Sequence, residues 1–198
     1  LERSTLDGVD CISASDEKGG GNSIEGETGI FLYGLMRRLK PRVVLETGTH
    51  WGFCSSFLGL GLQDNAIDYP EIQPHLITAD VNSYEGKPEA LWKKIGLDEI
   101  QITHVIGDSS KYDFRPHLRG AIDFLWYDSD HGREFVVEEF RNTFRLLNLN
   151  RTVLGFHDSR LDPREAEAIG DIKQLLQNTL EYRQWRNVSH WPIRNLRG

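Results

Sequence analysis

The sequence predicts an α/β protein whose core is a doubly wound, mostly parallel β-sheet with helices on both faces. Short apolar runs alternate with amphipathic stretches, the runs are rich in β-branched residues, and glycine or acidic residues follow most of them. Near-continuous apolar runs suit parallel strands that are buried on both faces. Strands that alternate with helices imply crossover connections, and therefore a parallel sheet covered on both sides.

The alternation begins after an N-terminal stretch without periodicity that contains Gly19-Gly20-Gly21-Asn22. We interpret residues 1–26 as a flexible segment, and the functional alternative is a lid that orders over a bound ligand. Residues 27–198 then form one folded domain, which is long enough to bury a hydrophobic core.

Within this domain, each expected strand is followed by an expected helix. The patterns predict strands at 42–46, 75–80, 102–106, 121–127 and 152–156. They predict helices at 27–39, 54–62, 89–95, 133–147 and 165–180, where apolar side chains recur at helical spacing. The tail from Tyr182 has room for one or two closing strands.

Composition excludes several classes of partner. A formal charge of -7 argues against a nucleic-acid backbone, because proteins that bind it carry basic stripes. No apolar run approaches the ~20 residues of a membrane span. Cys11 and Cys54 are the only cysteines and form no disulfide framework. We therefore expect a cytoplasmic protein with neither nucleic acid nor membrane as partner; a homo-oligomer is left open.

Polar residues gather where the predicted strands end. In open α/β sheets, ligands bind beyond the carboxyl ends of the strands, at the point where the strand order reverses. The residues at these ends are Glu46 and Gly48, Asp80, Asp108, Asp128 to His131, and His157-Asp158. They predict one binding site along the carboxyl edge of the sheet.

The first strand runs into the turn Glu46-Thr47-Gly48-Thr49-His50-Trp51-Gly52. Glycine suits a turn in which the backbone passes close to a ligand, although a tight turn without a ligand is the alternative. The spacing is Gly-x-x-x-Gly, and His50 stands where a dinucleotide fingerprint has its second glycine. NAD and FAD are therefore disfavoured.

This turn resembles the first motif of the class I S-adenosylmethionine-dependent methyltransferases, an acidic residue followed by Gly-x-x-x-Gly. The resemblance implies their Rossmann-like fold and S-adenosylmethionine as cofactor. It implies that Asp80 binds the ribose, because a carboxylate can accept hydrogen bonds from the two ribose hydroxyls. The full implied set of cofactor-binding residues is Glu46, Gly48, Thr49, Gly52, Asp80, Asp108, Ser109 and Asp128. The alternative for Asp80 and Asp108 is that they are exposed turn carboxylates.

Two later segments, 122–131 and 153–158, resemble the small metal-dependent O-methyltransferases, which include catechol and macrolide-sugar O-methyltransferases. The resemblance implies a divalent metal, Mg or Mn, held by Asp128, His157 and Asp158. His157 departs from the family pattern, which has a carboxylate there, and magnesium prefers oxygen ligands. His157 is therefore either a ligand of a softer metal or not a ligand.

The same resemblance makes His131 the general base, three residues after Asp128. A neutral imidazole can accept a proton near pH 7; the alternative is a polar residue beside the next helix. The predicted function is O-methylation of a hydroxyl on a small molecule, such as a sugar or phenol. The alternative is a non-catalytic or regulatory domain that binds S-adenosylmethionine with the same fold. A metal-dependent hydrolase is less favoured, because it would leave the glycine turn without a role.

Overall fold

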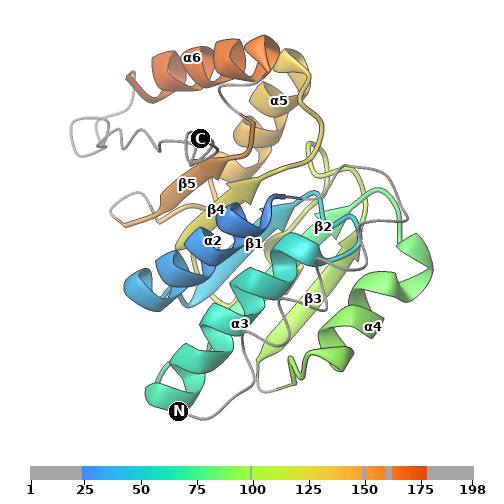
Figure 1. The fold of residues 1–198 in the computed structure, drawn as a ribbon. Coiled ribbons are helices and arrows are strands. Elements are labelled where there is room, and N and C mark those ends of the chain that lie inside the picture. Colours follow the sequence, from blue (N-terminus) through green and yellow to red (C-terminus); the bar gives the residue numbers. More distant parts are fainter. Residues whose placement is uncertain (1–23, 99, 149–150, 159–161, 178–198) are drawn as a thin grey trace, which may run out of the picture.

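The computed structural model describes residues 24–98, 100–148, 151–158 and 162–177 (Figure 1). Helices and strands alternate as the sequence predicts. In chain order they are α2 (Gly26–Leu39), β1 (Val43–Thr47), α3 (Phe53–Asp68), β2 (His75–Asp80), η2 (Tyr84–Gly86), α4 (Lys87–Lys94), β3 (Gln101–Ile106), η3 (Arg115–His117), β4 (Phe124–Tyr127), α5 (Arg133–Phe144), β5 (Val153–Phe156) and α6 (Pro163–Gln177). The predicted lid, up to residue 23, and the closing strands from Tyr182 lie outside the described residues.

The sheet has the order β3-β2-β1-β4-β5, and all neighbouring strands run parallel. In register, Val44 of the central strand pairs with Leu76 of β2 and with Phe124 of β4. The chain therefore winds outward from β1 in one direction and then returns to wind outward in the other. The order reverses between β1 and β4, so the carboxyl ends of these two strands border the expected binding crevice.

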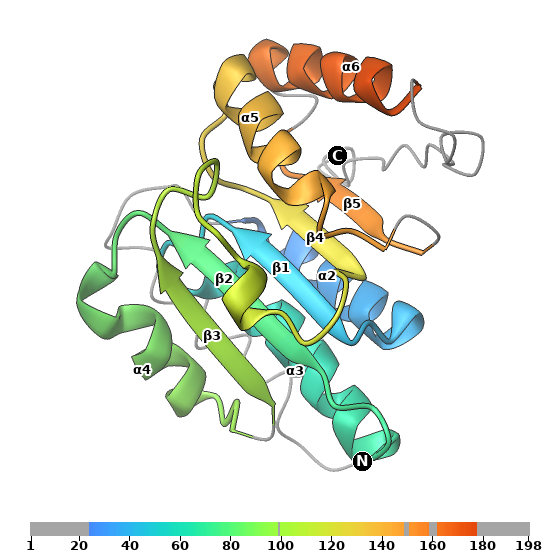
Figure 2. The same cartoon turned by 180° about the vertical axis from the view of Figure 1, so that it is seen from behind.

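Helices cover both faces of the sheet, as predicted. On one face α2 and α3 pack together over β1 (Figure 1). Their apolar side chains form a cluster with Val44, Leu76 and Phe124. On the other face α5 and α6 pack over a second cluster that includes Leu45 and Ile77 (Figure 2). Successive side chains of a strand point to opposite faces of the sheet, so each buried strand contributes alternately to the two apolar clusters.

The connection from β3 to β4 contains the short helix η3 (Figure 2). Apolar side chains of this connection, Tyr112, Phe114 and Leu118, join the second cluster. The strand predicted at 121–127 begins only at Phe124. Ahead of it, Ile122 forms an isolated parallel bridge with Leu147 instead of extending the strand beside β1. Oδ2 of Asp123 accepts the backbone N–H of Arg42 at 2.8 Å and so joins the start of β1 to the start of β4. Within the described ranges, no helix is both long and apolar enough to span a membrane.

Candidate active site

The glycine turn after β1 lies against its neighbours in the fold. The N–H of Gly48 donates to the carbonyl oxygen of Ala79 at 2.8 Å, which fastens the turn to β2. Gly48 has φ 90°, and a Cβ atom there would lie 1.8 Å from the carbonyl oxygen of Asp128. Gly52, with φ 81°, packs against α4, where a Cβ atom would be 3.0 Å from the Cα of Pro88. Both glycines are therefore required by the packing of the chain itself.

Glu46 lies beneath this turn and is fully buried. Its Oε2 accepts hydrogen bonds from the hydroxyls of Ser55 and Thr78, while its Oε1 has no hydrogen-bond partner among the described residues. Burial raises the pKa of Glu46 to about 7. The predicted cofactor residue Thr49 is also buried, and its hydroxyl lies 2.6 Å from that of Thr78. A chain of polar groups thus leads inward from the turn.

Asp80 stands at the end of β2, where its carboxylate is partly exposed. Its Oδ2 accepts the backbone N–H of His50 at 2.8 Å, and its Oδ1 accepts that of Asn82 at 3.0 Å. A carboxylate can accept about four hydrogen bonds, so each oxygen keeps capacity for a hydroxyl. Asp80 is therefore held in place by the glycine turn and remains able to bind a ligand.

Asp108 and Ser109 follow β3. The carboxylate of Asp108 accepts hydrogen bonds from Ser110 and from Nζ of Lys111, at 2.8 Å, and these lower its pKa. Ser109 is buried and donates its hydroxyl hydrogen bond to Glu139 of α5, which also accepts one from Ser129. Asp108 thus stabilises its own turn, and Ser109 faces the protein interior.

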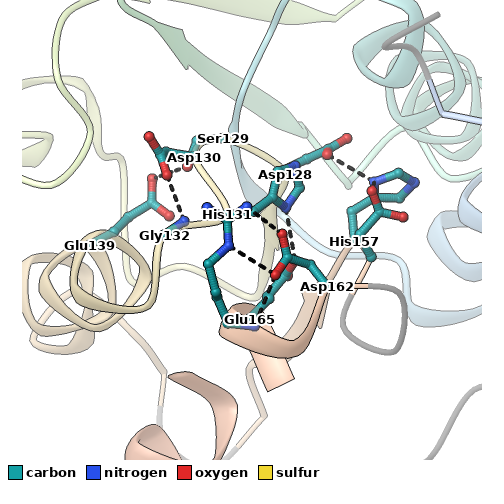
Figure 3. Close-up of polar contacts among 11 residues, drawn as sticks. Asp128, Ser129, Asp130, His131, Gly132, Glu139, His157, Asp162 and Glu165 are labelled. Atoms are coloured by element: carbon teal, nitrogen blue, oxygen red, sulfur yellow. Dashed lines mark hydrogen bonds and ion pairs between the residues drawn. The ribbon is translucent and has the colours of Figure 1, made fainter. Parts of the chain in front are cut away.

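The loop after β4 carries Asp128, Asp130 and His131 (Figure 3). Oδ1 of Asp130 accepts the N–H of Gly132 at 2.6 Å, immediately before α5 begins. Nδ1 of His131 lies 2.8 Å from Oε2 of Glu165 in the first turn of α6. That hydrogen bond is the main reason that the pKa of His131 is raised, and burial opposes the rise. The predicted base is therefore paired with a carboxylate from a different part of the chain.

Two of the predicted metal ligands, Asp128 and His157, lie together at the ends of β4 and β5 (Figure 3), and Asp158 follows His157 in the chain. Nδ1 of His157 is 3.1 Å from Oδ1 of Asp128 and 3.5 Å from Oδ2 of Asp158. Its Nε2 is 3.6 Å from Oε2 of Glu25. Burial opposes a positive charge on His157, but the hydrogen bond with Asp128 and the surrounding carboxylates raise its pKa to about 9. The surrounding carboxylates thus favour the positively charged form of His157.

This arrangement does not fit a metal centre. Among the described ranges, no three His, Cys, Asp or Glu side chains are grouped so that they could hold a metal ion. Metal binding requires neutral imidazole, so a metal here would have to displace the proton that the two carboxylates favour on His157. The structure brings the three predicted residues together, but Nδ1 of His157 faces the two carboxylates that would have to bind the metal.

Glu139 and Glu165 belong to the site but were missed from the sequence. Both are buried, at 0% and 2% exposure, and each bonds a residue of the loop after β4. Helical spacing could have found them. Glu139 lies three residues after Val136, and Glu165 lies three before Ala168, so each shares the buried face of its helix. Acidic residues are rarely buried without a partner, so their position on such a face indicates a specific role.

The strand order, the glycine turn after β1 and the acidic strand ends define a domain of the class I methyltransferase fold. A family model described as a methyltransferase domain matches residues 45–159, which is more than half of the chain. The protein therefore belongs to this methyltransferase domain family. This confirms the predicted resemblance.

Solved structures share the fold at low sequence identity. An O-methyltransferase from Bacillus cereus in complex with SAH is 17% identical with a TM-score of 0.65, over 91% of this chain and 81% of that chain. The O-methyltransferase TomG from Streptomyces achromogenes, involved in tomaymycin synthesis and solved with SAM, is 18% identical with a TM-score of 0.63, over 90% and 80%. SAH-bound PaMTH1 from Podospora anserina is 13% identical with a TM-score of 0.60, over 91% and 90%. No curated protein matches the chain.

Proposed function

We propose that this methyltransferase uses S-adenosylmethionine to methylate a hydroxyl group of a small molecule, such as a sugar or a phenol. The observation that carries the proposal is the position of His131. The loop that bears it follows β4 directly, and the same loop packs through the backbone of Asp128 against Gly48 of the glycine turn. The loop of the proposed base thus contacts the turn of the proposed cofactor site where the strand order reverses.

The carboxyl edge suits an adenosine-containing ligand. Asp80 keeps hydrogen-bonding capacity for ribose hydroxyls, as described above. Beside it, Val81 and Ile106 expose 63% and 48% of their surface, although both are apolar. Ile106 is the register partner of Asp80 in the sheet, so the two lie next to each other. Apolar walls around a few fixed polar groups are typical of small-molecule sites. The SAH- and SAM-bound structures named above support the same ligand class.

The chemistry needs few groups from the protein. When bound, S-adenosylmethionine supplies an electrophilic methyl group. His131 accepts the proton of the acceptor hydroxyl at Nε2, and the oxygen takes the methyl, which leaves a methyl ether, S-adenosylhomocysteine and a protonated His131. Most of the remaining work is alignment of the two reactants. None of these steps requires a metal, and the carboxylates of Asp128 and Asp158 face His157.

Calorimetry with S-adenosylhomocysteine tests the cofactor site. We expect Asp80→Asn to weaken binding by about 10- to 100-fold, because a charged acceptor of hydroxyl hydrogen bonds is lost. Asp113→Asn is the matched control, since Asp113 is an exposed carboxylate after β3 that bonds Arg115. Equal affinity in wild type and Asp80→Asn would place the cofactor elsewhere.

Turnover separates the enzyme from a non-catalytic binding domain. Methyl-labelled S-adenosylmethionine is incubated with catechol and with a methyl glycoside that carries vicinal hydroxyls, and labelled methyl ether is followed by NMR. Formation of ether that depends on His131 supports the proposal. Tight binding of S-adenosylhomocysteine, with no transfer to either probe and no effect of His131 substitution on S-adenosylmethionine consumption, supports the binding domain.

A further inference from the structure

Glu165 is an acidic residue in a costly position. It lies in the first turn of α6, exposes 2% of its surface, and bonds Nδ1 of His131 across 34 positions of sequence. Burying a carboxylate in a protein interior requires compensation. His131 is the compensating partner that the structure gives it, and the side chain of His131 is itself 32% exposed.

Packing of α6 does not explain this carboxylate. The helix is fastened to α5 by Arg133, whose guanidinium binds Asp171 at 2.8 Å and Glu167 at 3.2 Å on the protein surface. Ala168, Ile172 and Leu176 supply the buried apolar contacts of α6. An apolar residue at position 165 would continue this face without the cost of burying a charge.

The hydrogen bond has a chemical consequence for His131. An ionised Glu165 accepts, which favours a proton on Nδ1, and in the neutral ring the lone pair is then on Nε2. Nε2 has no hydrogen-bond partner among the described residues, so it is the nitrogen left for a substrate. When Nε2 takes up a proton, the adjacent carboxylate stabilises the resulting positive charge. In the Ser-His-Asp triad of hydrolases, a carboxylate supports the histidine base in the same way.

We propose that Glu165 is a positioning residue, which holds His131 with Nδ1 protonated and presents Nε2 to the acceptor hydroxyl. The catalytic part of this inference rests on the proposed function, whereas the hydrogen bond between Glu165 and His131 does not depend on it. Other charges also face His131: Asp128 and Asp158 from the strand ends and Asp162 from the start of α6, with His157 near Glu165. Only Glu165 among them bonds its ring directly.

Three variants isolate this role. Glu165→Gln keeps a hydrogen-bond acceptor but removes the charge, and Glu165→Asp keeps the charge on a shorter side chain. Glu167→Gln is the matched control, because Glu167 lies on the same helix and binds Arg133 on the surface. Chemical denaturation of each variant checks that the fold is retained.

The first readout does not depend on activity. A two-bond ¹H–¹⁵N NMR titration of the ligand-free protein reports the tautomer and the pKa of His131, whose signals are identified by their absence in His131→Gln. We expect the Nδ1–H tautomer in wild type and Glu167→Gln. In Glu165→Gln the pKa should fall by about one unit, because the charge beside the ring is lost; Glu165→Asp should restore most of it. An Nε2–H tautomer in wild type would overturn the proposal, even if Glu165→Gln does not fold.

The second readout is the pH profile of kcat for S-adenosylmethionine-dependent methylation of catechol. Activity requires neutral His131, so it rises with pH through the pKa of this residue. In Glu165→Gln we expect kcat to fall about 10- to 100-fold and the acid limb to move to lower pH. If Glu165 were purely structural, its substitution would leave the acid limb of the pH profile in place. That result would overturn the positioning role. Failure of wild type to methylate would count against the proposed function alone, and the NMR titration would still decide whether Glu165 sets the state of His131.

Discussion

The main chain of Asp128 lies directly against Gly48, so that a Cβ atom on Gly48 would be 1.8 Å from the carbonyl oxygen of Asp128. This contact joins the turn of the cofactor site to the loop of the base. We expect Gly48→Ala to destabilise the protein by about 3 kcal/mol or more, because strain at positive φ adds to a backbone clash. Urea denaturation measures it. Gly34→Ala is the control: Gly34 lies inside α2 with no atom within 4 Å of an added Cβ, and should gain about 0.5–1 kcal/mol. Equal urea midpoints for wild type and Gly48→Ala would contradict the contact.

Removal of the base should damage turnover and spare binding. We expect His131→Ala to lower kcat by about 10²- to 10⁴-fold, the usual cost of losing a general base. His131→Gln should be nearly as poor, because an amide does not accept a proton at neutral pH. Affinity for S-adenosylhomocysteine, measured by calorimetry, should change by no more than a few-fold. Near-wild-type turnover in both variants would remove His131 from the mechanism.

His157 decides whether the ends of β4 and β5 can bind a metal. In wild type its imidazolium lies 3.1 Å from Asp128, so we expect weak binding of Mn²⁺. His157→Asp replaces that charge with a carboxylate, which should tighten Mn²⁺ binding at least about 10-fold, since hard oxygen ligands suit this ion. Titration calorimetry with Mn²⁺ alone measures the change. His157→Asn, which is neutral, is the control. Wild type binding Mn²⁺ as tightly as His157→Asp would show that His157 gives up its proton to a metal.

Glu139 makes stability depend on pH. Burial raises its pKa to about 7 from 4.5, so the folded state holds a proton that the unfolded chain releases. The contribution of Glu139 to the free energy of unfolding is therefore fully present below about pH 4.5 and is lost as the pH rises through about 7. The loss is on the order of 3 kcal/mol.

We expect Glu139→Gln, which stays neutral, to gain stability relative to wild type between pH 5 and pH 8. Urea denaturation at the two pH values measures this gain. Glu138→Gln is the control, because Glu138 is the exposed neighbour on α5. A stability difference between Glu139→Gln and wild type that is the same at both pH values would mean that Glu139 keeps its charge in the folded state.

The helices and strands follow largely from local pattern. The range predicted for β2, 75–80, is the observed one, and the polar strand ends meet at one edge, because all strands run parallel. Helix α3 shows where local pattern was insufficient. It was predicted to end at Leu62 but continues to Asp68, since Asn65 and Asp68 bond α2 through Met36 and Arg37. Polar residues extend that helix through contacts that periodicity does not contain.

By itself, the sequence predicted the doubly wound sheet and set His131, Asp128, His157 and Asp158 after strand ends that meet at one edge, because the alternation of strands and helices follows from local apolar spacing. The cofactor contacts stay predictions. Only the tertiary structure decided how the side chains pair. It placed Glu165 on His131, Glu139 beside two serines, and His157 between Asp128 and Asp158. Protonation and metal binding depend on burial and on neighbours within a few ångströms, and those neighbours come from segments far apart in the chain.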